Sequence, residues 1–344
     1  AGIFTDAAPD RWGRMLLERR AAEMARAEGR RPGVLGEWEF LLGVNDRLRM
    51  GALRFADDDG AFLDASPSSV PPEADLRELQ AAARELERPT DNRRRSDLRA
   101  AIALLLEPGS PLGGARPKTS FRLEQGALWL AKFPSANDRR DVGAWEFVLN
   151  ALARKAGIDV PETRLLRLAG PHHTFTARRF DRSGEERRLF ASAMTLVGKR
   201  DRESASYVEI AEAISHHGAP GRIATDLAQL FRRVAFNILV GHRDDHLRNH
   251  GFLRDREGWR LAPAYDLNPM PELVEHELAI GIDSHAPDVA LALAETAPFC
   301  RLKADRAEQI IADVRSAIVG WQDMAAKLDI PAMEIDLIAS AFAT

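Results

Sequence analysis

The densest group of polar side chains lies in the segment GHRDDHLRNHGFL, residues 241–253. This segment directly follows the apolar run RRVAFNILV, and it ends in the apolar residues GFL. Unpaired charges are unfavourable between segments that favour burial, so a chain keeps them there mainly for a function. The segment is therefore the first candidate for a site of chemistry.

Two kinds of chemistry fit these residues. A metal-dependent hydrolase would use His242, Asp244, His246 and His250 as metal ligands. A phosphotransferase would use Asp244 to orient the attacking hydroxyl and accept its proton, and Asn249 to hold magnesium. His-Arg-Asp with an asparagine five residues after the aspartate is the catalytic-loop pattern of protein kinases. The spacing favours the phosphotransferase, and the hydrolase remains the alternative.

Further residues that phosphoryl transfer needs occur in the matching order. Asp266, in APAYDLNP, lies 22 residues after Asp244, where a kinase presents a second magnesium-binding carboxylate, although Tyr-Asp-Leu replaces Asp-Phe-Gly. Upstream, Lys132 in LAKF is the candidate that grips the α- and β-phosphates, and Glu146 is its candidate ion-pair partner. Each of these residues also has an ordinary explanation, as a turn aspartate, a strand lysine or a helix glutamate.

The glycine-rich segment GSPLGGARPKTS, residues 109–120, is a candidate phosphate-binding loop. Its glycines allow close approach of the backbone to phosphates, and its basic residues would neutralise charge. It matches neither a Walker A motif nor the kinase glycine-rich loop, so a plain linker is the alternative. The residues expected to bind the nucleotide here are Gly113, Gly114, Ala115, Arg116 and Lys118.

The elements that must position these residues form three parts. The first is mostly helical, with two helices in residues 10–55 and more helix in residues 73–106, broken at Pro89. The second begins with a β-hairpin in residues 119–133, in which Lys132 shares one face with two leucines.

The second part continues with a helix in residues 141–156 and strands in residues 164–168 and 174–180. Strands and one helix without regular alternation indicate an antiparallel sheet in an α+β arrangement. The third part is helical again, with its clearest helices expected in residues 207–216 and 223–240, and the end of the chain, residues 304–343, is expected to be helical as well.

The bulk composition is that of an ordinary globular protein. Its 344 residues suffice for two lobes, and no apolar run approaches the roughly 18 residues of a membrane span. A net charge of −4 argues against a nucleic-acid coat protein. The single cysteine, Cys300, excludes an internal disulfide framework, so we expect a cytoplasmic protein without membrane contact.

The motifs GGARPK, LAKF, WEF, ARRFDR, GHRDDHLRNHGFL and APAYDLNP occur together in one known family. In their order and approximate spacing the chain resembles HipA-type serine/threonine kinases, the toxins of bacterial toxin–antitoxin pairs. The resemblance implies an α+β, two-lobed protein-kinase-like fold with a small antiparallel-sheet lobe and a mostly helical C-terminal lobe. We expect residues 1–107 to form the helical part of the N-lobe, 108–185 its β-rich ATP-binding part, and 186–344 the C-lobe with the catalytic loop. The small subdomain with which family members begin is expected to be missing.

The resemblance also implies roles for single residues. Asp244 would be the catalytic base, Asn249 and Asp266 the magnesium ligands, and His246 would order the catalytic loop. The family's autophosphorylated serine falls at a proline here, and the neighbouring Ser110 is the candidate that replaces it. Near the adenine we expect Arg178, Arg179 and Phe180.

The implied cofactors are ATP and Mg²⁺. The implied substrate is a protein, with an aminoacyl-tRNA synthetase as the candidate, whose phosphorylation would arrest growth and favour persistence. The implied partner is a HipB-like DNA-binding antitoxin, through which alone the chain would contact DNA. A kinase-like fold without turnover, acting as a repressor or antitoxin-binding module, is the third possibility beside the kinase and the hydrolase.

Overall fold

The computed structural model describes residues 2–63, 70–88, 95–106, 116–123 and 126–342. The chain divides into unit 1, with residues 3–143 and 163–189, and unit 2, with residues 144–162 and 190–344. The sequence-based division treats the helix after residue 141 as part of the β-rich region, whereas nearly all of it belongs to unit 2. The candidates Ser110, Gly113, Gly114 and Ala115 lie outside the described residues.

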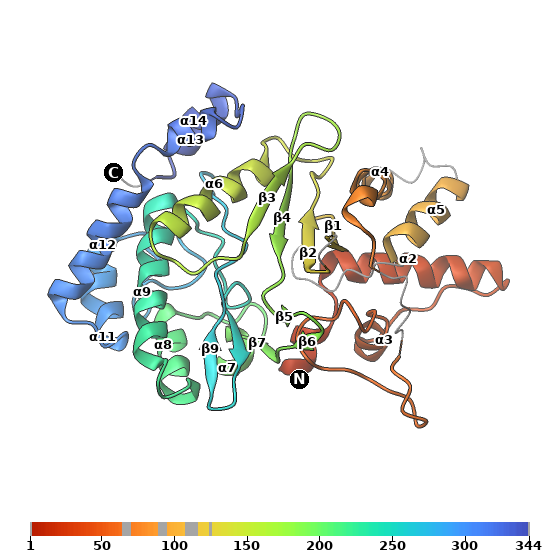
Figure 1. Ribbon diagram of the computed structural model, residues 1–344, viewed down its shortest axis with the longest axis horizontal. Coiled ribbons are helices and arrows are strands. Elements are labelled where there is room, and N and C mark those ends of the chain that lie inside the picture. Colours follow the sequence, from red (N-terminus) through yellow and green to blue (C-terminus); the bar gives the residue numbers. More distant parts are fainter. Residues whose placement is uncertain (1, 64–69, 89–94, 107–115, 124–125, 343–344) are drawn as a thin grey trace. The chain divides into compact units, whose positions relative to one another are not determined.

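Unit 1 combines helices with a four-stranded antiparallel sheet of strand order β1-β2-β4-β3 (Figure 1). A two-stranded hairpin, β5-β6, follows the sheet. The described elements are α1 (Ile3–Ala7), α2 (Arg11–Ala27), α3 (Glu37–Leu42), the 3-10 helix η2 (Glu73–Asp75), α4 (Leu76–Glu87), α5 (Arg95–Leu106), β1 (Lys118–Arg122), β2 (Leu128–Lys132), β3 (Thr163–Leu166), β4 (Thr174–Arg178), β5 (Arg182–Ser183) and β6 (Glu186–Arg187).

One hydrophobic core joins the helices of unit 1 to its sheet. Trp12 and Leu16 of α2, Leu79 of α4 and the strand residues Phe121 and Trp129 all belong to it. The predicted hairpin is confirmed, because β1 pairs with β2 in antiparallel register. On β2 the alternation of burial buries Trp129 and leaves the face of the predicted lysine half-buried. The helical start and the β-rich part of the chain therefore fold as one body.

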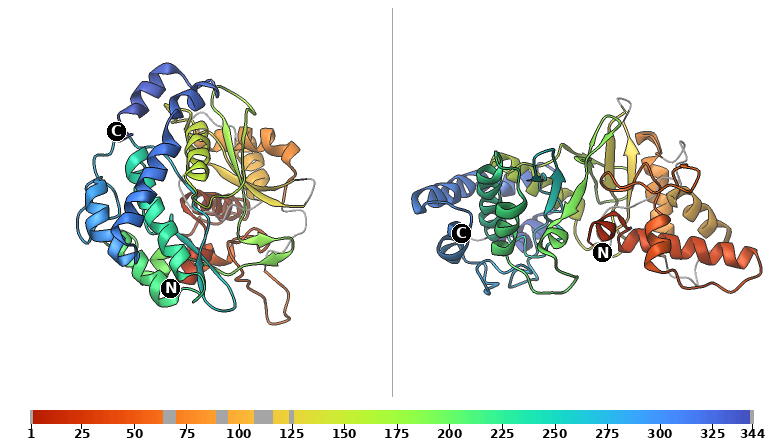
Figure 2. Two further views of the ribbon diagram at one scale, coloured as in Figure 1. Left: turned by 60° about the vertical axis from the view of Figure 1, so that its left-hand side comes forward. Right: turned by 90° about the horizontal axis from the view of Figure 1, so that it is seen from below.

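Unit 2 is mainly helical, with a small antiparallel sheet of strand order β7-β8-β9. Figures 1 and 2 show α8, α9 and α12 packed side by side, in agreement with their contacts. The described elements are α6 (Val142–Lys155), β7 (Phe190–Ser192), α7 (Ala193–Val197), α8 (Tyr207–His217), α9 (Ile223–Val240), β8 (Gly251–Arg254), β9 (Trp259–Leu261), α10 (Val289–Leu291), the π-helix η4 (Ala292–Thr296), α11 (Ala297–Phe299), α12 (Ala304–Ile318), α13 (Trp321–Ala326) and α14 (Ala332–Ala339).

One helical prediction needs correction. Helix α3 ends at Leu42, and residues 43–55 form turns, whose buried Arg49 donates to the carbonyls of Leu41 and Val44. The helical end of the chain is confirmed in the described residues and consists of the three helices α12, α13 and α14. It is interrupted at Gly320, which has a left-handed backbone, and before Pro331, which cannot continue a helix.

None of the helices in the described part of the chain combines the length and apolar character that a membrane crossing requires.

Candidate active site

The catalytic-loop motif lies in unit 2, between α9 and β8. Helix α9 ends at Gly241, whose φ of 65° is the left-handed conformation typical of a helix C-cap. A Cβ atom built on Gly241 would lie 2.5 Å from the carbonyl oxygen of Ala341, so only glycine fits without a shift. This fixed turn sets the direction in which residues 242–250 leave the helix.

The first loop residues are tied to the segment that carries Asp266. The buried His242 has its Nδ1 atom 2.9 Å from the carbonyl oxygen of Asn268, and the amide of Met270 donates to the carbonyl of Gly241 at 2.9 Å. Arg243 donates to the carbonyl of Leu273 at 2.5 Å. The start of the loop and the segment after Asp266 are therefore connected by one backbone hydrogen bond and by the side chains of His242 and Arg243.

Three of the predicted site residues lie close together in this region. The side-chain amide of Asn249 donates to the backbone carbonyl of Asp244 at 3.3 Å. Asp266 is near enough for its charge to affect the titration of Asp244. Asp266 has a φ of 62°, an uncommon left-handed backbone that aspartate tolerates better than most residues. Such strained conformations are frequent at functional sites.

The environment of Asp244 raises the pKa of its carboxyl group above the ordinary 3.8. Although its side chain is open to solvent, partial desolvation is the largest cause, and the carboxylates of Asp266 and Glu277 act in the same direction. His246 and His242 oppose this shift. A cation bound between Asp244 and Asp266 would relieve their repulsion, and oxygen ligands of this kind suit Mg²⁺.

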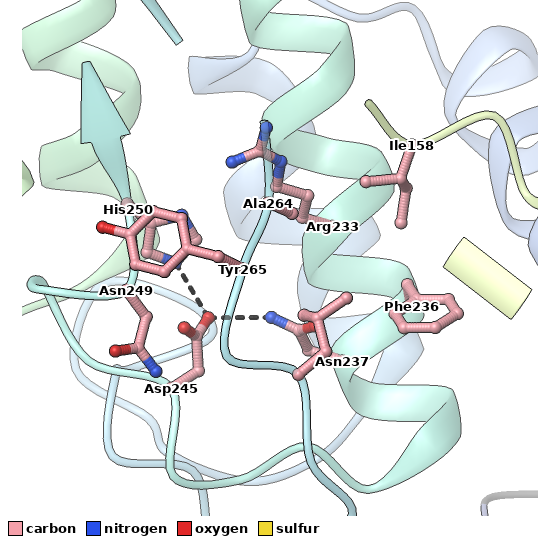
Figure 3. Close-up of a pocket in the computed structure, with 10 residues that line it drawn as sticks. Ile158, Arg233, Phe236, Asn237, Asp245, Asn249, His250, Ala264 and Tyr265 are labelled. Atoms are coloured by element: carbon pink, nitrogen blue, oxygen red, sulfur yellow. Dashed lines mark hydrogen bonds and ion pairs between the residues drawn. The ribbon is translucent and has the colours of Figure 1, made fainter. Parts of the chain in front are cut away.

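Asp245, next in the chain, has the opposite environment. It is 2% exposed, and its Oδ2 atom accepts hydrogen bonds from the Asn237 amide at 2.7 Å, from His250 at 2.8 Å and from the hydroxyl of Tyr207. Figure 3 shows Asn237 and His250 directed at Asp245 from α9 and from the end of the loop. Burial alone would raise the pKa of Asp245. The charge and hydrogen bond of His250, the charge of His242 and the bond from Tyr207 outweigh it, so the pKa is lowered.

The histidines of the motif are used in different ways. His242 and His250 are buried and contact Asn268 and Asp245, respectively, whereas the half-buried His246 influences the charge of Asp244. Within the described ranges no group of three or more His, Cys, Asp or Glu side chains is arranged to hold a metal ion. The ligand cluster on which the hydrolase alternative depends is therefore not formed. The ordering role of His246 stays a prediction.

The predicted basic residues of unit 1 have partners within that unit. Arg116 forms an ion pair with Asp138, and the Nζ atom of Lys118, which is 2% exposed, lies 2.7 Å from Asp10. Lys132, at the end of β2, has its Nζ atom 5.7 Å from the ring centre of Phe175. Their roles in binding nucleotide phosphates stay predictions.

The Arg178, Arg179 and Phe180 segment begins where β4 ends. The guanidinium of Arg179 is buried and pairs with Asp181 at 2.7 Å, so its side chain is engaged inside unit 1. Glu146 is buried on α6 of unit 2. The positions of these residues beside the adenine, and the ion pair of Glu146 with Lys132, likewise stay predictions.

Sequence reasoning missed the residues behind the loop. The sequence assigns no separate role to Asp245 within the motif. It also gives no sign that Asp245 contacts Tyr207 on α8 or Asn237 on α9. One signal was present, because Asn237 is a polar residue inside the apolar run of α9. A polar side chain at such a position needs a partner, and the following loop supplies it.

Comparisons with known proteins show which proteins the chain is similar to. A curated protein of Haemophilus influenzae named "Putative kinase" is 28% identical over 198 residues, which cover 50% of this chain and 57% of that protein. "Putative kinase Y4dM" of Sinorhizobium fredii is 27% identical over 204 residues, which cover 55% of this chain and 49% of that protein. The chain thus spans about half the length of the curated relatives that it matches.

A solved structure extends the likeness to nearly the whole chain. It is the HipA of Shewanella oneidensis MR-1, from a complex with HipB and its operator DNA, with a TM-score of 0.66, 16% sequence identity and coverage of 95% of this chain and 82% of that one. This likeness confirms the two-lobed, kinase-like α+β fold. The model of the HipA-like C-terminal domain matches residues 110–321, more than half of the chain, and the chain therefore belongs to the family of proteins with that domain.

Proposed function

We propose that the chain is a Mg-ATP-dependent serine/threonine protein kinase of the HipA type. The observation that carries the proposal is the grouping of Asp244, Asn249 and Asp266 in unit 2, with the amide of Asn249 on the backbone of Asp244 and the charge of Asp266 acting on it. These are the residue types and the chain order of the kinase catalytic loop and its metal carboxylate.

Each residue has a role in this proposal. Asp244 orients the substrate hydroxyl and accepts its proton, as the aspartate of a kinase catalytic loop does. Asn249 and Asp266 hold Mg²⁺, which neutralises charge on the phosphates of ATP. Lys132 grips the phosphates from β2, with Arg116 and Lys118 nearby in the chain.

The proposed substrate is a protein, with an aminoacyl-tRNA synthetase as the first candidate and growth arrest as the consequence. The proposed partner is a HipB-like antitoxin, and the related Shewanella HipA is described in a complex with HipB and DNA. Autophosphorylation at Ser110 belongs to the same proposal, because this serine neighbours the family's modified position.

The decisive experiment uses the purified chain, labelled ATP and a lysate of its host. We expect Mg²⁺-dependent transfer of label to one protein, identified by mass spectrometry, and no transfer by the Asp244→Asn variant. Lys132→Ala should weaken the use of ATP while the protein stays folded, because the side chain lies outside the hydrophobic core. Activity that needs zinc, or that survives Asp266→Asn unchanged, would contradict the proposal.

A further inference from the structure

Two of the proposed site residues, Asp244 and Asn249, are each followed in the chain by a buried side chain. Asp244 is exposed, whereas the next residue, Asp245, is 2% exposed. Asn249, the proposed metal ligand, is itself only 7% exposed, and the next residue, His250, is 2% exposed. Each of two site residues is thus followed by a buried one, and the two buried side chains contact each other at 2.8 Å.

The contact between Asp245 and His250 closes the loop on itself. It joins the residue after Asp244 to the residue after Asn249, so the span between the proposed base and the proposed metal ligand is fixed at both ends. The backbone adds a parallel connection, because the amide of Asn249 donates to the carbonyl of His246 at 2.8 Å. Residues 245–250 therefore form a ring that is closed by hydrogen bonds within the loop itself.

Two helices hold this ring in place. Asn237, in the last turn of α9, donates its side-chain amide to Asp245 and accepts the amide of His242 with its carbonyl at 2.9 Å. Tyr207, the first residue of α8, donates its hydroxyl to Asp245, and its ring meets that of His250 edge to face, with centroids 5.6 Å apart. Because both helices are packed in the core of unit 2, they give the loop a rigid support.

From this geometry we infer that Asp245 is a positioning residue, which fixes Asp244 and Asn249 relative to each other through Tyr207, Asn237 and His250. The inference rests on the proposed function for its kinetic consequence. Asp245 is not expected to touch substrate, because its carboxylate is buried and its Oδ2 atom accepts all three hydrogen bonds from neighbouring side chains. Catalysis depends steeply on placement, and a shift of about 1 Å can reduce a rate by about 10²-fold.

The experiment compares Asp245→Ala and Asp245→Asn with matched changes at Asp226. Asp226 is an equally buried aspartate of unit 2, 4% exposed, which accepts the amide of Leu261 at 2.9 Å and is remote in sequence from the loop. For each variant we would measure kcat per folded molecule, the KM for ATP and the Mg²⁺ concentration that gives half-maximal activity. The midpoint temperature of thermal unfolding is measured as well.

We expect Asp245→Ala to lower kcat by about 10²-fold and to raise the required Mg²⁺ concentration, because Asp244 and Asn249 are then no longer held in a fixed position relative to each other. Asp245→Asn keeps an acceptor oxygen without the charge and should restore part of kcat. The Asp226 variants should lower only the thermal midpoint. Equal kinetic losses at both positions, or an unchanged kcat in Asp245→Ala, would overturn the inference.

Hydrogen exchange separates this inference from the proposed function. In the Asp245 variants, the amides of His242 and Asn249 should exchange faster, while those of β8 and β9 stay protected. This result would support the positioning role even if the wild-type chain transferred no phosphate. Unchanged protection of the loop amides would count against the role, whatever the activity.

Discussion

Asp181 in unit 1 and Asp245 in unit 2 are both buried aspartates that accept several hydrogen bonds, and they differ in their donors. In unit 1, Asp181 is 0% exposed and accepts from the guanidinium groups of Arg179 and Arg182 and from the amide of Gly51. In unit 2, Asp245 accepts from an amide, a hydroxyl and an imidazole.

The arginines of unit 1 extend the contact to the backbone. Arg179 donates to the carbonyl of Leu48 at 2.6 Å, and Arg182 donates to that of Arg49 at 2.6 Å. Asp181 therefore fastens two chain segments more than a hundred residues apart with permanently charged groups. Asp245 instead orients short, rigid side chains beside the proposed chemistry. We infer that the first aspartate serves stability and the second serves geometry.

The largest expected effect is on activity, at the exposed end of the unit 2 loop. Asp244→Asn should lower phosphotransfer by roughly 10²–10⁴-fold, the usual contribution of a positioned acid–base group. Asp266→Asn should also abolish most of the transfer, because it removes the proposed metal carboxylate. Asparagine also tolerates the left-handed backbone of Asp266, so stability should be retained. Transfer of label from ATP is measured against Glu257→Gln, an exposed change in the turn between β8 and β9. If these variants failed to fold, the inference that this loop serves activity rather than stability would be contradicted.

The next effect is on the stability of unit 1. Asp181→Ala leaves Arg179 and Arg182 buried without their carboxylate, so we expect a loss of about 3–5 kcal/mol in the free energy of unfolding. Urea unfolding would measure it, with Glu185→Ala in the exposed β5–β6 turn as the control. A loss below about 1 kcal/mol would mean that the ion network contributes little beyond specificity.

A smaller effect is expected for Tyr207→Phe in unit 2. The variant keeps the ring that packs against His250 and removes one of the three donors to Asp245. A hydrogen bond to a charged group contributes about 1.5–3 kcal/mol. Two donors remain, so we expect a loss near the low end of that range, measured by thermal unfolding, together with a modest fall in kcat. If kcat falls as far as in Asp245→Ala, the tyrosine rather than the aspartate is the central support.

The smallest effect concerns acid. Burial would raise the pKa of Asp181, but Arg179 and Arg182 outweigh it and hold the pKa below the ordinary 3.8, and Arg54 and Arg187 do the same for Asp46. A lowered pKa stabilises the folded state above the ordinary value, and this contribution is lost as pH falls through the folded-state pKa. Unit 1 should therefore keep its stability from pH 7 to about 5 and lose it progressively below about pH 4.

Unfolding curves at several pH values test this dependence. The variant Asp181→Asn should show a weaker loss below about pH 4 than the unmodified chain, because one of the two titrating carboxylates is gone. An equal loss of stability in both proteins would show that acid destabilises the chain by protonating groups other than Asp181.

The sequence predicted the elements with strong periodicity well. The limits of α9 and the β1–β2 pairing followed from apolar patterns and turn residues. It failed for residues 43–55, where turns are satisfied by the buried side chain of Arg49, a tertiary contact that no local pattern reveals. The same reason explains the site. Asp244, Asn249 and Asp266 have motif spacing, whereas Tyr207 and Asn237 are connected to Asp245 only by the packing of α8 and α9.

The close packing of Gly241 on Ala341 bears on how the protein folds during synthesis. The two residues are 100 positions apart, so a ribosome that adds about 5–20 residues per second makes the partner about 5–20 seconds after the loop. Until then the start of the loop has nothing to pack against on that side. A newly made chain therefore passes through an interval in which α9 is complete but the packing of its C-cap glycine on Ala341 is still missing. A partner that binds the emerging chain in this interval would meet the proposed site before that contact has formed.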